Sequence, residues 1–305
     1  MLPRIGDSLS FLYIDIARIV QDDTGVTARF ELGDDVHRVA LPTAALGCLL
    51  LGPGVSITTR ALSTLARHGT TVICTGAGGV RCYAASVADS LPTRWLETQV
   101  RAWSDDTQRA AVARRMYRQR FGDTVPADAG IAQLRGLEGQ RMKALYRMLA
   151  EQNGVRPFKR SYAPDDWDAQ DPVNRALSAA NTCLYGIAHA AINAIGCTPG
   201  LGFVHTGTSH SFVYDIADLY KAELTLPLAF ALHDSTDPDG QARRSFRDGL
   251  RLFRLLPRIV ADIQTLLDPD DGTRQEDAEE AAEELVDLWD PDFGRLAGGT
   301  NYGHE

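Results

Sequence analysis

Alternating apolar and polar positions, with the two-residue period of β-strands, dominate the first part of the chain. Residues 10–21 and 26–42 are rich in β-branched and aromatic side chains, and turn-forming residues separate them. Residues 70–76 and 80–86 flank a glycine-rich turn, which predicts a β-hairpin. Together these patterns predict a β-rich domain over residues 1–88.

One segment of this domain, residues 51–69, has a different pattern. It starts with a glycine–proline–glycine sequence that is typical of a chain break, and it continues with apolar residues at helical spacing. Gly69 stands where the C-terminal glycine of a helix belongs. We therefore expect a helix that begins after the break and ends near Gly69.

From about Pro92 onward, the apolar spacing changes to the 3.6-residue period of helices. The pattern predicts helices over residues 94–121, 131–152, 171–196, 212–231 and 241–267. The change falls near residues 86–93, so we expect a C-terminal all-α helical domain over residues 93–267. The predicted fold class is α+β, with the N-terminal β-rich domain first and the helical domain second.

Acidic residues are concentrated in a tail over residues 268–305. The tail holds 13 acidic and 2 basic residues, a net charge of −11, so the rest of the chain carries +2 of the total of −9. This composition predicts an acidic, partly disordered end. Residues 275–290 could also form a helix with Leu285, Leu288 and Trp289 on one side. A solvated tail and a docking helix for a protein partner therefore both stay open.

The overall composition argues against several classes of protein. The chain has 305 residues and is 44% apolar, which is typical of soluble globular proteins. It contains no run of the roughly 18 apolar residues that a membrane helix needs, and its first residues lack the apolar core of a signal peptide. The five cysteines fit neither a disulfide framework nor a zinc site. We expect a cytoplasmic protein without membrane contacts.

Four polar residues stand in segments that are otherwise built to be buried or helical: Glu138, His205, Asp215 and Asp218. Burying a charge is costly unless a partner compensates it, and a divalent cation is such a partner. Asp215 and Asp218 are three residues apart and share one face of a helix. Carboxylates with one imidazole suit Mg²⁺ or Mn²⁺ better than zinc, and magnesium sites of this kind commonly serve phosphate chemistry. Each residue taken singly could instead be a capping or ion-paired surface group, such as Glu138 with Arg141.

Basic residues favour a polynucleotide substrate. One predicted helix carries five arginines at spacings of three and four residues, which places them on one face: Arg244, Arg247, Arg251, Arg254 and Arg258. A phosphate backbone would relieve their mutual repulsion, and so would acids on a neighbouring helix or in the tail. Arg135 and Arg141 flank Glu138 and are further candidates for phosphate contacts.

Several motifs together resemble one family. The segments LRGLEGQR (134–141), DPVNRALSAANTCLYG (171–186), GFVHTG (202–207) and SFVYDIADLYK (211–221) are similar to the spacer-integrase subunit of CRISPR adaptation, with the closest match in the subtype I-E branch. The resemblance extends from about residue 8 to residue 267. One departure is Thr208, because related members often carry a basic residue just after HTG.

The resemblance implies a β domain followed by a helical domain, and homodimers bridged by a small ferredoxin-like partner subunit. It implies that Glu138, His205 and Asp218 bind the metal and that Asp215 is a further acidic residue needed for activity. Arg81 would join the residues that hold DNA phosphates. Tyr13 is nearest to a family aromatic that braces the end of the DNA duplex.

These observations predict a metal-dependent DNA integrase and endonuclease. It would use Mg²⁺ or Mn²⁺ to join the 3′-hydroxyl ends of short double-stranded DNA fragments into a CRISPR repeat by transesterification. Two alternatives stay open. One is a structure-specific endonuclease that cuts branched DNA in repair with the same site, and the other is a catalytically silent DNA-binding scaffold.

Overall fold

The computed structural model describes residues 11–32, 35–77, 81–86, 88, 91–122, 129–155, 158, 160, 171–247, 249–269, 288–290 and 294–296. Two compact units make up the chain, residues 1–267 and residues 268–305. The side chains of residues 246–254 and of the tail strands lie outside the described part. None of the described helices combines the length and apolar character that a bilayer crossing requires.

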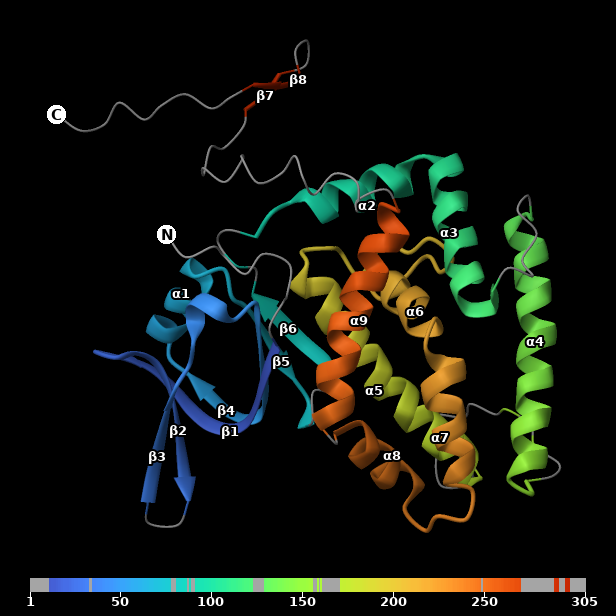
Figure 1. Ribbon diagram of the computed structural model, residues 1–305, viewed down its shortest axis with the longest axis horizontal. Coiled ribbons are helices and arrows are strands. Elements are labelled where there is room, and N and C mark those ends of the chain that lie inside the picture. Colours follow the sequence, from blue (N-terminus) through green and yellow to red (C-terminus); the bar gives the residue numbers. More distant parts are fainter. Residues whose placement is uncertain are drawn as a thin grey trace. The chain divides into compact units, whose positions relative to one another are not determined.

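A six-stranded mixed sheet forms the N-terminal part of the first unit (Figure 1). Its strands follow the order β3-β2-β1-β4-β5-β6, where β1 pairs in parallel with β4, β4 in parallel with β5, and the other neighbours are antiparallel. The strands are β1 (Phe11–Asp22), β2 (Gly25–Leu32), β3 (Asp35–Ala40), β4 (Cys48–Ile57), β5 (Thr71–Thr75) and β6 (Cys82–Ser86). The predicted hairpin of β5 and β6 is confirmed.

Strand β4 corrects one expectation, because it continues through the glycine–proline–glycine sequence that we expected to break the chain. The register with β1 shifts there, between Ile14 and Ile16. A Cβ atom on Gly52 would lie 2.8 Å from the Asp15 Cα atom of the backbone, so the crowded bulge requires glycine at this position. The helix α1 (Thr59–Arg67) follows the strand, and Gly69 has the expected positive φ of 77°.

The two faces of the sheet belong to different cores, as the strand period requires. Leu49 and Leu51 of β4 pack with Leu65 of α1 in one apolar cluster. Cys48 and Leu50 of the same strand belong to the core of the helical part. The sheet therefore has α1 on one face and the helical part on the other.

The helical part extends from residue 94 to residue 267, which confirms the predicted α+β class. It contains α2 (Arg94–Ser104), α3 (Asp106–Phe121), α4 (Ile131–Gln152), α5 (Pro172–Ala194), α6 (Ser211–Asp218), the π-helix η4 (Lys221–Thr225), α7 (Leu226–Ala231), α8 (Pro238–Arg247) and α9 (Gly249–Leu267). Its centre is α5, whose many buried alanines allow α6, α7, α8 and α9 to approach it closely.

Three predicted helices are each divided in the structure. The segment 94–121 breaks at Asp105, whose backbone is extended (φ −105°, ψ 118°) and whose carboxylate accepts a hydrogen bond from the Gln108 N–H at 2.7 Å. Asp105 thus caps the N-terminus of α3. The segment 212–231 contains the π-helix η4 between α6 and α7, and the segment 241–267 divides into α8 and α9, which run in different directions (Figure 1).

The tail contains an antiparallel pair of short strands, β7 (Leu288–Asp290) and β8 (Gly294–Leu296). The predicted helix over residues 275–290 is therefore wrong for its last three residues. Residues 275–287 lie outside the described part of the chain.

Candidate active site

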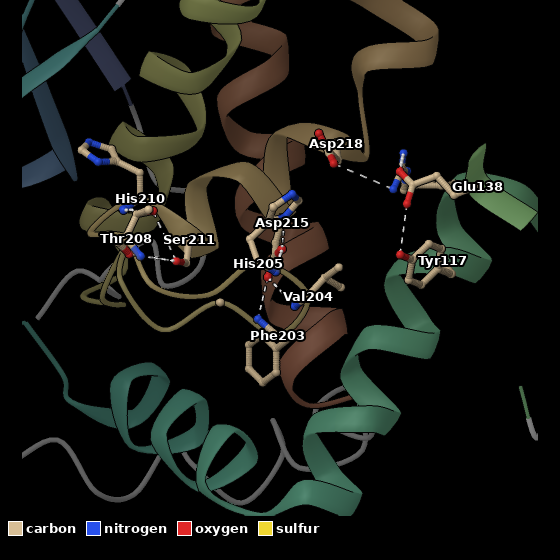
Figure 2. Close-up of polar contacts among 12 residues, drawn as sticks. Tyr117, Glu138, Phe203, Val204, His205, Thr208, His210, Ser211, Asp215 and Asp218 are labelled. Carbon is tan, nitrogen blue, oxygen red and sulfur yellow. Dashed lines mark hydrogen bonds and ion pairs between the residues drawn. The ribbon is translucent and has the colours of Figure 1, made fainter. Parts of the chain in front are cut away.

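Asp215 is the most completely bonded polar residue of the site. Its side chain, on α6, is fully buried, and it accepts hydrogen bonds from the backbone N–H groups of Phe203 (2.5 Å), Val204 (3.0 Å) and His205 (2.9 Å). Its Oδ1 atom also lies 2.7 Å from the His205 Nδ1 atom (Figure 2). These contacts use the whole carboxylate, so Asp215 fixes the loop that presents His205 and orients the imidazole ring.

The His205 imidazole is 44% exposed. The hydrogen bond to Asp215 raises the pKa of His205 above its ordinary value, although partial burial acts in the opposite direction. With Nδ1 facing Asp215, the Nε2 atom is the ring nitrogen left for other partners. A carboxylate behind an imidazole is the arrangement that commonly supports histidine ligands of metals.

Helix α2 also holds the loop that presents His205. The Gln99 side chain is completely buried; its amide donates to the Thr198 and Leu201 carbonyls and accepts from the Thr198 N–H. The Trp103 indole donates to the Gly202 carbonyl at 3.1 Å. A Cβ atom on Gly202 would lie 2.4 Å from the His205 carbonyl oxygen, so the loop closes tightly only with glycine there.

Glu138 faces α3 from α4 (Figure 2). Its Oε1 atom lies 2.6 Å from the Arg120 Nη2 atom, and its Oε2 atom accepts a hydrogen bond of 3.1 Å from the Tyr117 hydroxyl. Burial and the nearby charge of Glu138 raise the pKa of Tyr117 well above its ordinary value, so the phenol keeps its proton and donates. Tyr117 and Arg120 are three residues apart and therefore share one face of α3.

Asp218 ends α6 and meets two cations. Its Oδ2 atom lies 4.0 Å from Arg120, and its Oδ1 atom lies 2.5 Å from the Lys221 ammonium of η4. Burial lowers the pKa of Lys221, but the charge of Asp218 raises it, and the net direction is upward. The Lys221 ammonium thus occupies the Oδ1 atom of Asp218.

Two of the predicted ligands, His205 and Asp218, line one small cavity. A cavity of about 10 Å³, about the size of one water molecule, is lined by Met116, Tyr117, Arg120, Val204, His205, Asp215 and Asp218. Glu138 contacts two of these residues, Tyr117 and Arg120. Carboxylate oxygens and an imidazole nitrogen fit Mg²⁺ or Mn²⁺ in their chemistry. As the side chains stand, however, no three His, Cys, Asp or Glu side chains of the described residues are close enough to share one ion.

A larger cavity of about 710 Å³ opens beside the site, between the β5–β6 turn and α5, α6 and α8. Its lining includes three arginines, Arg81, Arg160 and Arg243, and the ring of Tyr214. It also includes Tyr185, whose ring lies 4.9 Å from the Lys221 ammonium. The cavity therefore offers positive charge and aromatic surface, and the role of Arg81 in DNA binding stays a prediction.

The five arginines between Arg244 and Arg258 do not lie on one continuous helix, because α8 ends at Arg247 and α9 begins at Gly249. Arg244 pairs with Asp237 at 2.8 Å, and the two terminal nitrogens of the Arg258 guanidinium donate to Glu223 at 2.8 and 2.9 Å. Arg258 thus pairs with an acid on a neighbouring helix, η4, as the alternative interpretation expects, whereas the partner of Arg244 directly precedes its own helix. The side chains of Arg247, Arg251 and Arg254 lie outside the described part.

The other residues that were predicted to contact DNA are Arg135, Arg141 and Tyr13, and they differ in their exposure and partners. Arg135 is exposed, one helical turn before Glu138. Arg141 donates to the Phe121 carbonyl at 3.0 Å and lies over its ring, which stabilises the junction of α3 and α4. Tyr13 packs partly against the helical core, and its hydroxyl donates to Asp15 at 2.9 Å. The role of Tyr13 at a duplex end stays a prediction.

Three further residues of the site, Arg120, Lys221 and Gln99, were not predicted from the sequence. Lys221 was the easiest to find, because it follows Asp218 by three residues in a motif that we had singled out. Arg120 and Gln99 have partners 18 and 99 residues away, and no local pattern marks them.

The fold, a β-sheet part followed by a helical part, is similar to that of proteins with solved structures. The crystal structure of a TtCas1–DNA complex matches with a TM-score of 0.77 and 40% identity, over 88% of this chain and 99% of that one. The family model for CRISPR associated protein Cas1 matches residues 119–238, which contain all four candidate site residues.

Two relatives match over nearly the whole length. The CRISPR-associated endonuclease Cas1 of Clostridium sp. (strain SY8519) is 41% identical over 308 residues, 100% of this chain and 99% of the relative. The CRISPR-associated endonuclease Cas1 2 of Thermus thermophilus is 40% identical over 305 residues, 99% of this chain and 92% of the relative. The chain belongs to the Cas1 family.

Proposed function

We propose that this Cas1 protein is a divalent-metal-dependent DNA endonuclease and integrase, which joins 3′-hydroxyl ends of short DNA fragments into a CRISPR repeat by transesterification. One observation carries the proposal. His205 and Asp218 line one small cavity, and Glu138 of α4 contacts two further lining residues, Tyr117 and Arg120. The relatives named as CRISPR-associated endonucleases support the same reaction class.

Each residue of the chain has a definite task in this proposal. Glu138, His205 through Nε2, and Asp218 would hold Mg²⁺ or Mn²⁺. When bound, the cation would neutralise charge that develops on the reacting phosphate. Asp215 keeps the proton of the imidazole on Nδ1 and so leaves Nε2 free. Tyr117 and Lys221 hold the two carboxylates in fixed directions before DNA arrives.

The arginine-lined cavity is the proposed path of DNA to the site. Arg81, Arg160 and Arg243 would contact backbone phosphates, and the tyrosine rings offer surfaces on which bases can stack. The solved complex of TtCas1 with DNA supports a DNA substrate for this chain. Arg135, which is exposed beside Glu138, would add a contact near the reacting phosphate.

We also propose an assembly. The resemblance favours a homodimer that works with a small ferredoxin-like partner subunit, within the subtype I-E branch. The CRISPR-associated endonuclease Cas1 of Escherichia coli, 38% identical over 256 residues and 83% of this chain, is a further relative in the family. The acidic tail is the part of the chain whose charge suits a protein partner rather than DNA.

A strand-joining assay tests the proposed reaction. Asp218→Asn should abolish joining of a fragment with free 3′ ends to repeat DNA in Mn²⁺, whereas Asp237→Asn, at an exposed ion pair, should keep wild-type joining. Normal joining by Asp218→Asn would refute the site. Cutting of branched DNA without any joining would favour the repair endonuclease, and the absence of both would favour the silent scaffold.

A further inference from the structure

Arg120 occupies the space between two of the proposed metal ligands. Its guanidinium lies 2.6 Å from Glu138 and 4.0 Å from Asp218, and its side chain is only 11% exposed. The rings of Phe121 and Tyr117 lie 4.9 and 5.8 Å from it and support its position. Arg120 is therefore a fixed internal cation.

The charges of the site are balanced in this state. Glu138 and Asp218 carry two negative charges, and Arg120 and Lys221 carry two positive charges within 4.0 Å of them. The charge of Asp215 is shared with three backbone N–H groups and the imidazole, so Asp215 does not need Arg120. A divalent cation would bring two further positive charges into a site whose carboxylates are already compensated.

The volume of the cavity also argues against a divalent cation beside Arg120. Arg120 lines the cavity of about 10 Å³ together with His205 and Asp218, so about one water molecule fits in what remains. A guanidinium and a divalent cation that both need the Glu138 and Asp218 oxygens cannot occupy this space together, because their charges repel at short distance.

We infer that Arg120 holds the cation-free site closed by binding between Glu138 and Asp218, and that it must leave this position before a divalent cation can be bound. The inference rests on the proposed function, since it takes Glu138, His205 and Asp218 as the ligands. Arg120 is thus a positioning residue that competes for the ligands.

Titration calorimetry with Mn²⁺ on the full chain, without DNA, tests the inference. Arg120→Gln removes the competing charge, so it should bind Mn²⁺ about tenfold more tightly or better, the scale of one lost charge-assisted hydrogen bond. Arg120→Lys keeps a charge that cannot span both carboxylates and should fall between this variant and the wild type. Arg118→Gln removes the same charge from an exposed position of α3 and should match the wild type.

The outcomes separate the inference from the proposed function. Equal or weaker Mn²⁺ binding by both Arg120 variants would overturn the role of Arg120. If Arg120→Gln does not fold, the rise in melting temperature that saturating Mn²⁺ gives Arg120→Lys decides, and it should exceed the rise in the wild type. If Asp218→Asn binds Mn²⁺ as tightly as the wild type, the proposed metal site itself fails, whatever Arg120 does.

Discussion

Replacing Asp215 with asparagine tests how the site is built. The substitution keeps the shape of the side chain and removes its charge. Oδ2 accepts from Phe203 and Val204, whereas Oδ1 accepts from His205 N–H and faces the imidazole. Asparagine has one oxygen, so its NH₂ group must face at least one backbone N–H donor.

The cost follows from these contacts. A hydrogen bond to a charged acceptor contributes roughly 1.5–3 kcal/mol, and a buried donor left unpaired costs a similar amount. With the oxygen at the Oδ2 position, one such bond is lost and the others lose their charge assistance. We expect the free energy of unfolding to fall by about 3 kcal/mol, measured by urea denaturation.

The imidazole reports the same change independently. The asparagine NH₂ group would donate to Nδ1, which moves the ring proton to Nε2 and removes the lone pair that the proposed site needs. The ¹⁵N NMR shifts of the His205 ring should therefore show protonation on Nε2. Unchanged stability with the proton still on Nδ1 would refute this account of Asp215, and Asp237→Asn is the matched control.

Three further predictions concern other parts of the molecule. Burial and the neighbouring His210 lower the pKa of His189 to about 4, so the unfolded chain binds a proton at His189 more readily than the folded chain does. The free energy of unfolding should therefore fall by about 1–2 kcal/mol as the pH drops from 6.5 to 4. In His189→Gln this dependence of stability on pH should be weaker. Gly202→Ala should lower the free energy of unfolding by about 2 kcal/mol or more. Gly200→Ala should change it little, because a Cβ atom there would meet nothing closer than 3.9 Å. Equal effects of the two substitutions would contradict the tight packing of the loop at Gly202. Arg81→Ala should weaken DNA binding and reduce the slope of log affinity against log salt concentration by about 1. Arg67→Ala on α1 should change neither quantity. An unchanged slope in Arg81→Ala would show that Arg81 does not contact a DNA phosphate.

The sequence predicted the two halves of the fold because each half has one dominant period. The two faces of β4 pack against different cores, and the Ala-rich pattern of α5 marks the centre of the helical part. The break at Asp105 could not be found in this way. A capping aspartate between two helices has the same polar character as an exposed residue within one helix.

The site was predictable only in part. The acids and the histidine stand out because charge in an apolar segment is costly. An acid at position 215 suits a metal ligand and an acceptor of backbone hydrogen bonds equally well. Which of these roles Asp215 has depends on the loop 203–205, which the fold brings to α6. Arg120 was missed for the same reason, because its partners lie on α4 and α6.

The central claim is that Glu138, His205 and Asp218 bind one divalent cation. Anomalous diffraction at the manganese edge from crystals grown with Mn²⁺ tests it most directly. A single strong peak bonded to both carboxylates and to the His205 Nε2 atom, with Arg120 moved away from Glu138, is the predicted result. Absence of a peak at these residues under saturating Mn²⁺, with Arg120 still between the carboxylates, would contradict the account.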